Sequence, residues 1–181
     1  MREVLSKAFD LNRYGLHCRL VNEEDAAFIV NLRSDEKRSR FIHKTDQDVS
    51  KQRHWIRDYK EREAKGQEYY FIYEIDGVPF GVNRIYNIEI DHCTEGSWVC
   101  LQIDDTSKAI ASALIIRDII FEVLDFDYDV FDVRLDNKKV RTFHKISGAQ
   151  LTGKTDIDAL YMLTKEDYFA NRPWFIKTYC L

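Results

Sequence analysis

The amino-acid sequence predicts an α/β (α+β) protein in which helices flank a mixed, twisted sheet of about seven strands. Strand-like and helical segments follow one another in the order β-α-α-β-β-β-α-β-α-β-β, and strand–helix–strand crossovers bring parallel strands into a sheet. The pair Asp76-Gly77 stands between two runs rich in β-branched and aromatic residues. It therefore predicts a hairpin turn and antiparallel neighbours in the same sheet.

The individual elements follow from residue periodicity and from capping residues. The predicted strands alternate apolar and polar residues or gather β-branched and aromatic ones, and they cover residues 16–21, 69–75, 78–90, 95–103, 129–135 and 159–163. Asn22 with Asp25 predicts a capped helix over 26–32, and Asp46 or Asp48 predicts the start of a second helix that continues to 65. Apolar residues at helical spacing predict two more helices, over 107–124 and 138–147.

Composition and charge narrow the class of protein. The 181 residues contain no linker, repeat or low-complexity tract, so we expect a single domain over 1–181. The net charge of -4 excludes a general nucleic-acid binder. Four scattered cysteines favour free thiols in a reducing cytoplasm over a zinc site or a disulfide framework, so we expect no metal. With no long apolar run and a charged N-terminal segment, we expect neither a membrane span nor a signal peptide.

Several short motifs occur in the expected elements. They are Arg19-Leu20-Val21 with Asp25, Gly81, the segment Glu95-Gly96-Ser97-Trp98-Val99, and Asn137 with Gly148 eleven residues later. With this element order, the chain from about residue 14 to 168 resembles the GNAT N-acetyltransferases, in the branch that includes ribosomal-protein and sugar-nucleotide N-acetyltransferases. The resemblance implies the GNAT fold, acetyl-CoA as co-substrate, and a cofactor cleft where the 95–103 strand splays from the 129–135 strand.

The resemblance also implies which residues bind acetyl-CoA. The family's phosphate loop, Gln/Arg-x-x-Gly-x-Gly/Ala, aligns with Thr106-Ser107-Lys108-Ala109-Ile110-Ala111, where only the last position agrees and Ala109 replaces the first glycine. Backbone N–H groups at a helix start bind a pyrophosphate without glycines. We expect Thr106 or Ser107 to cap this helix and Lys108 to add a cation. An ordinary capped core helix is the alternative interpretation.

Other parts of the chain complete the implied cofactor site. The backbone of Trp98, Val99 and Cys100 is expected to pair with the pantetheine amides as an added strand, and Trp98 serves equally well as a core aromatic residue. The resemblance also implies that Asn137 and Phe143, which follow the 129–135 strand, bind acetyl-CoA.

The catalytic candidates lie on the same two elements. Family members often carry a tyrosine seven residues after the asparagine, and this chain has His144 there. His144 is therefore expected to protonate the departing CoA thiolate, a packing or surface role being the alternative. Glu95 and His92 are candidates for the base that neutralises the amine, although residues of these types in a turn are usually only solvated. We expect direct attack by the amine, with no acyl carrier at Cys100.

The acceptor is expected to be an amine on a small molecule, with no nucleic acid or membrane as partner. The helix pattern Asn-x-x-Val-x-x-Phe-His resembles acetyltransferases that act on amino-sugar nucleotides in surface-polysaccharide biosynthesis. A nucleotide needs aromatic faces and cations, and Arg40, Phe41, Arg84 and Tyr86 are the candidates. The alternatives are a protein N-terminal amine, as in ribosomal-protein acetyltransferases, and a non-catalytic CoA-binding module. The sequence leaves a homodimer open.

Overall fold

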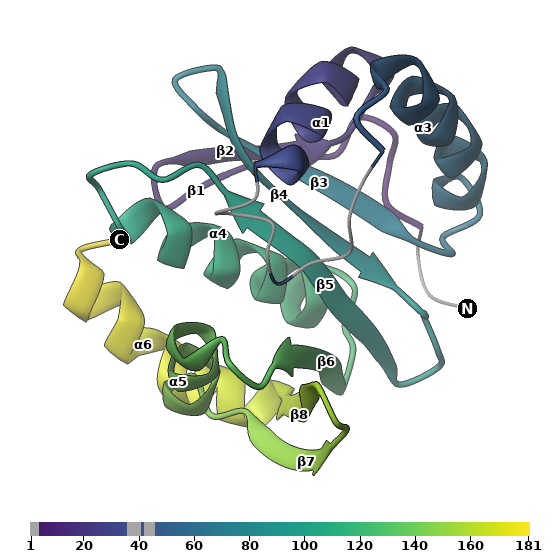
Figure 1. Ribbon diagram of the computed structural model, residues 1–181. Coiled ribbons are helices and arrows are strands. Elements are labelled where there is room, and N and C mark those ends of the chain that lie inside the picture. Colours follow the sequence, from purple (N-terminus) through teal and green to yellow (C-terminus); the bar gives the residue numbers. More distant parts are fainter. Residues whose placement is uncertain (1–3, 36–40, 42–45) are drawn as a thin grey trace.

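An eight-stranded sheet runs through the computed structural model, which describes residues 4–35, 41 and 46–181 (Figure 1). The strand order is β1-β2-β3-β4-β5-β6-β8-β7, and every neighbouring pair is antiparallel except β5 and β6. The strands are β1 (Asp10–Arg13), β2 (Leu16–Leu20), β3 (Tyr69–Ile75), β4 (Val78–Tyr86), β5 (His92–Cys100), β6 (Tyr128–Arg134), β7 (Gln150–Lys154) and β8 (Asp158–Thr164).

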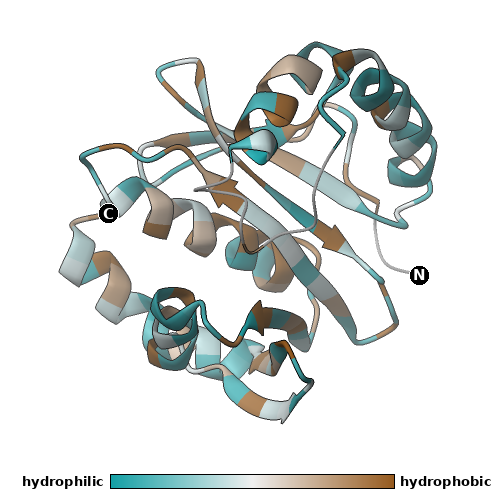
Figure 2. Ribbon diagram, viewed as in Figure 1, coloured by the Kyte–Doolittle hydropathy of each residue, from teal (hydrophilic) through white to brown (hydrophobic). Residues whose placement is uncertain are grey.

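Helices cover both faces of this sheet. They are α1 (Ala26–Ser34), α3 (Val49–Glu63), α4 (Ser107–Asp118), α5 (Lys138–Ile146) and α6 (Lys165–Tyr179), with a 3-10 turn η1 (Glu23–Asp25) and a π-helical turn η2 (Ile119–Val123). One apolar cluster joins α1 and α3 to the sheet, and a larger one joins α4 and α6 to it. Figure 2 shows the contrast that results: α4 is largely apolar because the sheet and α6 enclose it, whereas α3 is largely hydrophilic.

Strand β3 shows how the two clusters share one sheet. Successive side chains of a strand point to opposite faces, and all but the last residue of β3 are buried. Tyr69, Phe71 and Tyr73 pack in the cluster with α4, and Tyr70 and Ile72 pack in the cluster with α1 and α3. The strand is therefore the centre of the core.

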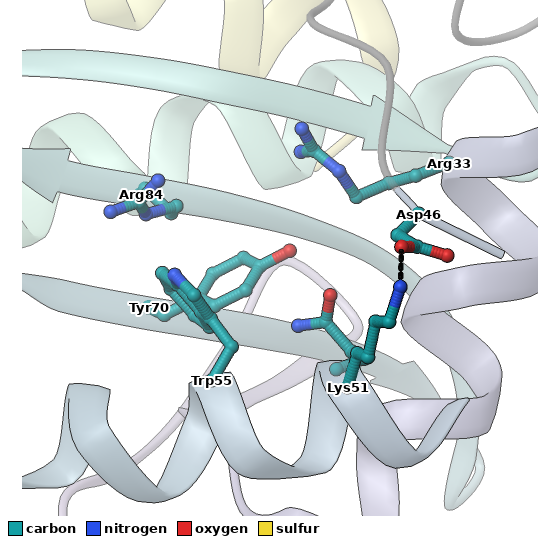
Figure 3. Close-up of a pocket in the computed structure, with 7 residues that line it drawn as sticks. Arg33, Asp46, Lys51, Trp55, Tyr70 and Arg84 are labelled. Atoms are coloured by element: carbon teal, nitrogen blue, oxygen red, sulfur yellow. Dashed lines mark hydrogen bonds and ion pairs between the residues drawn. The ribbon is translucent and has the colours of Figure 1, made fainter. Parts of the chain in front are cut away.

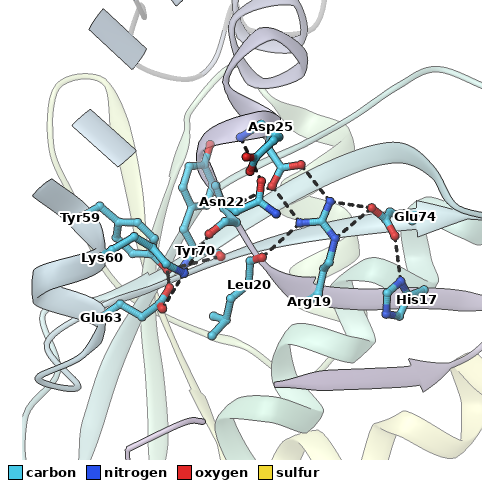
Figure 4. A network of polar contacts seen from close by, with 12 residues as sticks. His17, Arg19, Leu20, Asn22, Asp25, Tyr59, Lys60, Glu63, Tyr70 and Glu74 are labelled. Carbon is cyan, nitrogen blue, oxygen red and sulfur yellow. Dashed lines mark hydrogen bonds and ion pairs between the residues drawn. The ribbon is translucent and has the colours of Figure 1, made fainter. Parts of the chain in front are cut away.

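A polar network joins strand β2 to its neighbours in this core (Figure 4). Arg19 donates two hydrogen bonds of 2.8 Å to the carboxylate of Asp25 and also contacts Glu74 at 2.7 Å. His17 contacts the other oxygen of Glu74 at 2.8 Å. Asp25 in turn accepts from the backbone of Asn22, which completes the predicted capping box. The network joins β2, β3 and the entry to α1.

The predicted mixed sheet with flanking helices is confirmed, and several predicted details are confirmed with it. Asp76 and Gly77 form the β3–β4 turn with φ values of 50° and 78°, as a two-residue hairpin of this type requires. Asp48 caps α3 by accepting from the N–H groups of Ser50 and Lys51. Among the described residues, no helix combines the length and the apolar character that crossing a bilayer requires.

The structure differs from the prediction in three details. The sheet has eight strands because β1 pairs with β2 through a turn at Tyr14 and Gly15, with φ values of 55° and 68°. The helix predicted over 107–124 changes to a π-helical turn after Asp118. Helix α6 follows strand β8, in a stretch for which the sequence analysis predicted no element.

Candidate active site between β5 and β6

Strands β5 and β6 are paired only where they begin. Their parallel pairing runs from His92–Tyr128 to Thr94–Val130 and, within these two fully described strands, goes no further. β5 remains paired with β4, and β6 remains paired with β8, over the rest of their lengths. The two strands therefore diverge, and the sheet opens into the predicted cleft.

A cavity of about 390 Å³ lies in this opening. Both strands, the start of α4 and the first part of α5 contribute to its walls. The predicted residues that line it are Phe41, Glu95, Trp98, Val99, Cys100, Ala109, Asn137 and His144. The sequence analysis missed the β6 side of the wall, which includes Phe131, Asp132 and Arg134.

An irregularity in β5 shapes the cavity wall. The register between β4 and β5 shifts between Val82 and Arg84, and Ser97 has a φ of 58°. A bulge of this kind bends a strand and re-aims its side chains, and bulges are frequent beside active sites. Gly96 directly precedes Ser97. A Cβ atom on Gly96 would lie 2.6 Å from the Tyr86 hydroxyl. Tyr86, which is predicted to bind the acceptor substrate, thus packs directly over Gly96 of β5.

Trp98 and Cys100 are fixed by one hydroxyl of α4. The Trp98 indole N–H donates to Ser112 Oγ at 3.0 Å, and that hydroxyl lies 3.5 Å from Cys100 Sγ and donates to the Ala109 carbonyl. Burial raises the pKa of the Cys100 thiol to about 11. Cys100 is therefore a neutral thiol at physiological pH.

The start of α4 differs from the prediction in its cap. Neither the Thr106 nor the Ser107 hydroxyl caps the helix; the carboxylate of Asp105 accepts from the Ser107 N–H at 3.0 Å and from its hydroxyl at 2.5 Å. Lys108 Nζ donates to the Gly15 carbonyl at 3.3 Å, toward the β1–β2 turn. Within the predicted phosphate loop, which the structure describes throughout, only Ala109 lines the cavity, while Ala111 is buried and Ile110 half-buried against the core.

Helix α5 and its N-cap carry three predicted residues, of which Asn137 and His144 line the cavity. The Asn137 side chain caps the helix by accepting from the Val140 N–H at 3.4 Å. The Phe143 ring lies 5.7 Å from the Trp98 ring and 5.4 Å from the Phe175 ring, between the cleft and α6. His144 is buried, and its ring lies 4.3 Å from that of Phe131.

A cluster of buried polar groups lies beneath His144. Arg117 of α4 is completely buried, and its Nη2 lies 3.0 Å from His144 Nδ1 and 3.1 Å from Glu95 Oε2. Glu95 Oε1 accepts from the Asn83 amide at 3.0 Å. The Glu95 backbone N–H donates to Asp129 at 3.1 Å. The sequence analysis missed Arg117, although a charged pair within the apolar run 113–121 is a signal of buried charge.

Burial controls the charge states in this cluster. It lowers the pKa of His144 well below its usual value, and the positive charge of Arg117 lowers it further. Burial and the neighbouring Glu95 raise the pKa of Asp129 well above its usual range. The surroundings therefore favour a neutral imidazole at His144 and a protonated carboxyl at Asp129, beside the ion pair of Arg117 with Glu95.

His92, the other predicted base, lies at the paired end of β5. Its ring stacks on Tyr128 with 4.7 Å between centroids, and its Nδ1 lies 2.7 Å from the Asp91 carboxylate. It is not among the residues that line the cleft cavity. Of the two base candidates, Glu95 is the one that the fold brings together with His144.

A second cavity, of about 320 Å³, lies between α3 and the sheet. Figure 3 shows Trp55 projecting from α3 toward the strands that carry Tyr70 and Arg84, with Arg33 across the cavity. Lys51 Nζ, on the same helix, contacts Asp46 at 2.7 Å. Four residues were predicted to bind the acceptor substrate. Of these, Arg84 lines this cavity and Phe41 lines the cleft cavity, while Arg40 lies outside the described residues.

Arg84 connects the two cavities. Its guanidinium lies 5.0 Å from the Trp55 ring and 5.3 Å from the Tyr86 ring, and it pairs with Glu68 at 2.6 Å. In the sheet, Arg84 is the direct cross-strand partner of Gly96, which lines the cleft cavity. A molecule held beside Arg84 is therefore one strand pair away from the cleft.

Known proteins that resemble this chain share its fold. No protein-family model matches the sequence, and no curated protein matches it. Among solved structures, apo FdhC, a nucleotide-linked sugar GNAT, superposes with a TM-score of 0.83 at 34% identity over 92% of this chain and 96% of its own. RimJ of Mycobacterium smegmatis, solved with CoA-disulfide, superposes with a TM-score of 0.76 at 18% identity, covering 90% of this chain and 88% of its own.

The ribosomal-protein-S5-alanine acetyltransferase of Vibrio fischeri gives a TM-score of 0.72 at 13% identity, covering 88% of this chain and 98% of its own. The diverging parallel strands, the helix start beside them and these likenesses define an enzyme that transfers an acetyl group. The chain belongs to the GNAT superfamily of N-acetyltransferases, whose co-substrate is acetyl-CoA.

Proposed function

We propose that this enzyme transfers the acetyl group of acetyl-CoA to the amino group of a nucleotide-linked sugar. The observation that carries the proposal is the second cavity, where Arg33 and Arg84 accompany the aromatic rings of Trp55 and Tyr70. A guanidinium matches the oxygens of a phosphate group, and an aromatic face stacks on a nucleobase. The 34% identity to a nucleotide-linked sugar GNAT supports the same acceptor class.

The position of this cavity suits such an acceptor. Because Arg84 is paired across the sheet with Gly96, a nucleotide bound beside Arg84 extends its sugar toward the bulged part of β5. The amine then attacks the thioester carbonyl: a C–N bond forms, the C–S bond breaks, CoA leaves as a thiolate, and the amine loses one proton to solvent. Residues of the cleft hold the thioester, with Trp98 and Val99 on one wall and Asn137 on the other.

A panel of acceptors tests the proposal. Release of the CoA thiol is measured with nucleotide-linked 3-amino and 4-amino sugars, with the corresponding free amino sugars, with peptides that carry a free N-terminal amine, and with polyamines. We expect turnover with the nucleotide-linked sugars and a much higher KM for the free sugars, which lack the diphosphate. Turnover of the peptides alone would replace the proposal with the protein N-terminal acceptor.

A variant pair links the second cavity to the acceptor. Trp55→Ala removes an aromatic face, so we expect a higher KM for the nucleotide-linked sugar, by about 10-fold to 100-fold for one lost stacking contact, with the KM for acetyl-CoA unchanged. Trp174→Ala on α6 is the matched control, because Trp174 is a half-exposed tryptophan elsewhere on the molecule. Equal KM values for the sugar in both variants would remove the cavity from acceptor binding.

A further inference from the structure

Arg117 is a completely buried cation beneath the cleft. Its side chain is fully enclosed, and its guanidinium lies between the rings of Phe131 and Phe143, at 5.5 and 5.6 Å. Only Nη2 reaches polar partners, His144 Nδ1 and Glu95 Oε2, while Nε and Nη1 have no hydrogen-bond partner in the described part of the chain. Burying a charge in this way is costly. Two of the three guanidinium nitrogens make no hydrogen bond that would offset this cost.

The contact with His144 determines the tautomer of the imidazole. A guanidinium is always protonated and can only donate hydrogen bonds. His144 Nδ1 must therefore accept, since it lies 3.0 Å from Arg117 Nη2. A neutral imidazole carries one proton, so that proton is on Nε2.

We propose that Arg117 is a positioning residue that holds His144 as the neutral Nε2–H tautomer, so that His144 donates a hydrogen bond to the departing CoA sulfur without transferring a proton. This inference rests on the proposed function. It changes the sequence-based prediction of His144 as an acid, because a neutral imidazole stabilises a thiolate by its N–H group and keeps its proton. The thiolate leaves as such, and the proton released in the reaction is the one that the amine loses to solvent.

The groups around His144 agree with this state. Arg117 faces it from α4, Glu95 lies beyond Arg117 on β5, Asp129 lies on β6, and the Tyr161 ring of β8 lies 6.2 Å away. Glu95 balances the charge of Arg117, while burial and the neighbouring Glu95 raise the pKa of Asp129 well above its usual range. A second positive charge on His144 would lie against Arg117 in a buried site without a carboxylate of its own, which disfavours the imidazolium.

Nitrogen NMR of the cofactor-free protein tests the tautomer directly. The protein is labelled with 15N-histidine, and His144→Gln identifies the His144 signals among those of the five histidines. We expect Nδ1 to be unprotonated, Nε2 to carry the proton, and neither shift to titrate between about pH 6 and 8. A ring with its proton on Nδ1, or a titration near 6.5, would overturn the proposal.

Substitution of the arginine gives a second measurement. Arg117→Met keeps much of the apolar volume and removes the donor, so we expect mixed tautomers and a kcat lower by about 10-fold to 100-fold, as for other lost supporting contacts, with an unchanged KM for acetyl-CoA. Arg117→Lys restores a donor and should recover part of kcat. Arg172→Met, which removes an arginine of α6 bound to Asp118, is the control for lost stability.

The proposed function and the role of Arg117 can be disproved independently. If acetyl-CoA does not raise the melting temperature and no amine is acetylated, the proposed function is wrong, whatever the NMR result. If turnover is normal and the wild-type ring carries its proton on Nδ1, only the role of Arg117 is wrong. Should Arg117→Met not fold, the wild-type spectrum alone decides the proposal.

Discussion

Cys100 lies on the cavity wall, where a nucleophilic cysteine would compete with the amine for the thioester. Burial raises the pKa of its thiol to about 11, and only a thiolate attacks a thioester efficiently. A Cβ atom at Gly81 would lie 2.5 Å from Cys100 Sγ, so the thiol fills the space that a side chain on β4 would otherwise occupy. Cys100 is thus a packing residue of β5.

The first prediction concerns the Cys100 thiol. Cys100→Ala should leave kcat for acetyl transfer unchanged and lower stability slightly, since a small buried group is lost. Turnover and thermal unfolding of the variant are measured beside those of Cys180→Ala, which alters an exposed cysteine. A variant that binds acetyl-CoA but transfers no acetyl group would make Cys100 an acyl carrier.

At the scale of the element, the start of α4 is the part of the site that departs furthest from the family pattern. The Asp105 carboxylate accepts from the Ser107 N–H at the start of the helix, where the resemblance expects a pyrophosphate. An anion at a helix N-terminus interacts favourably with the helix dipole. A bound pyrophosphate and this carboxylate therefore compete for the same donors.

The second prediction concerns Ala109, the residue of this turn that lines the cavity. Ala109→Leu should weaken acetyl-CoA binding because the larger side chain fills space beside Trp98, whereas Ala109→Gly should bind as the wild type does. Calorimetry with CoA measures both variants. Equal affinity in all three proteins would show that the phosphate loop has been aligned incorrectly.

The elements that the sequence predicted well are those with a local signal. Asp76-Gly77 and the Asn22–Asp25 capping box lie where expected because turn and cap chemistry depends on a few neighbouring residues. Helix α6 was missed because its apolar residues do not follow one face and because it contains Pro173, a residue that disfavours helix in a sequence. Its start had a readable signal, since Thr164 caps the helix by accepting from the Asp167 N–H at 3.1 Å.

The candidate site was predictable in part for the same reason. Glu95, Trp98, Asn137 and His144 stand in short motifs, and the fold brings them to one cavity. The contact of His144 with Arg117 joins residues 27 positions apart, and no local pattern encodes it. Tertiary packing also decides that His144 is neutral, a property that its sequence position could not reveal.

At the scale of the whole molecule, two histidines make stability depend on pH in opposite ways. Burial and Arg117 lower the pKa of His144 below the ordinary 6.5, so its contribution is present above about pH 6.5 and lost as the pH falls. Hydrogen bonds that the His17 ring donates to the carboxylates of Asp10 and then Glu74 raise the pKa of His17. Its contribution is present below about pH 6.5 and is lost as the pH rises through the folded-state value.

The third prediction compares these two sites. The difference in unfolding free energy between wild type and His144→Gln should shrink as the pH falls from about 7 to 5, whereas the difference for His17→Gln should shrink as the pH rises from about 6 to 8. Denaturant unfolding at a series of pH values measures both. Parallel curves for the two variants would contradict the assigned charge states.

The short pairing of β5 with β6 also divides the sheet into two blocks of strands. On one side of that seam lie five antiparallel strands, β1 to β5, and on the other lie β6, β8 and β7. Three register pairs hold the two blocks together there, with the hydrogen bond from the Glu95 N–H to Asp129, the stacking of His92 on Tyr128, and the helices packed on the sheet. A ligand that fills the cleft contacts both blocks and therefore stabilises their association. Binding of the co-substrate is thus coupled to the stability of the contact between the two blocks.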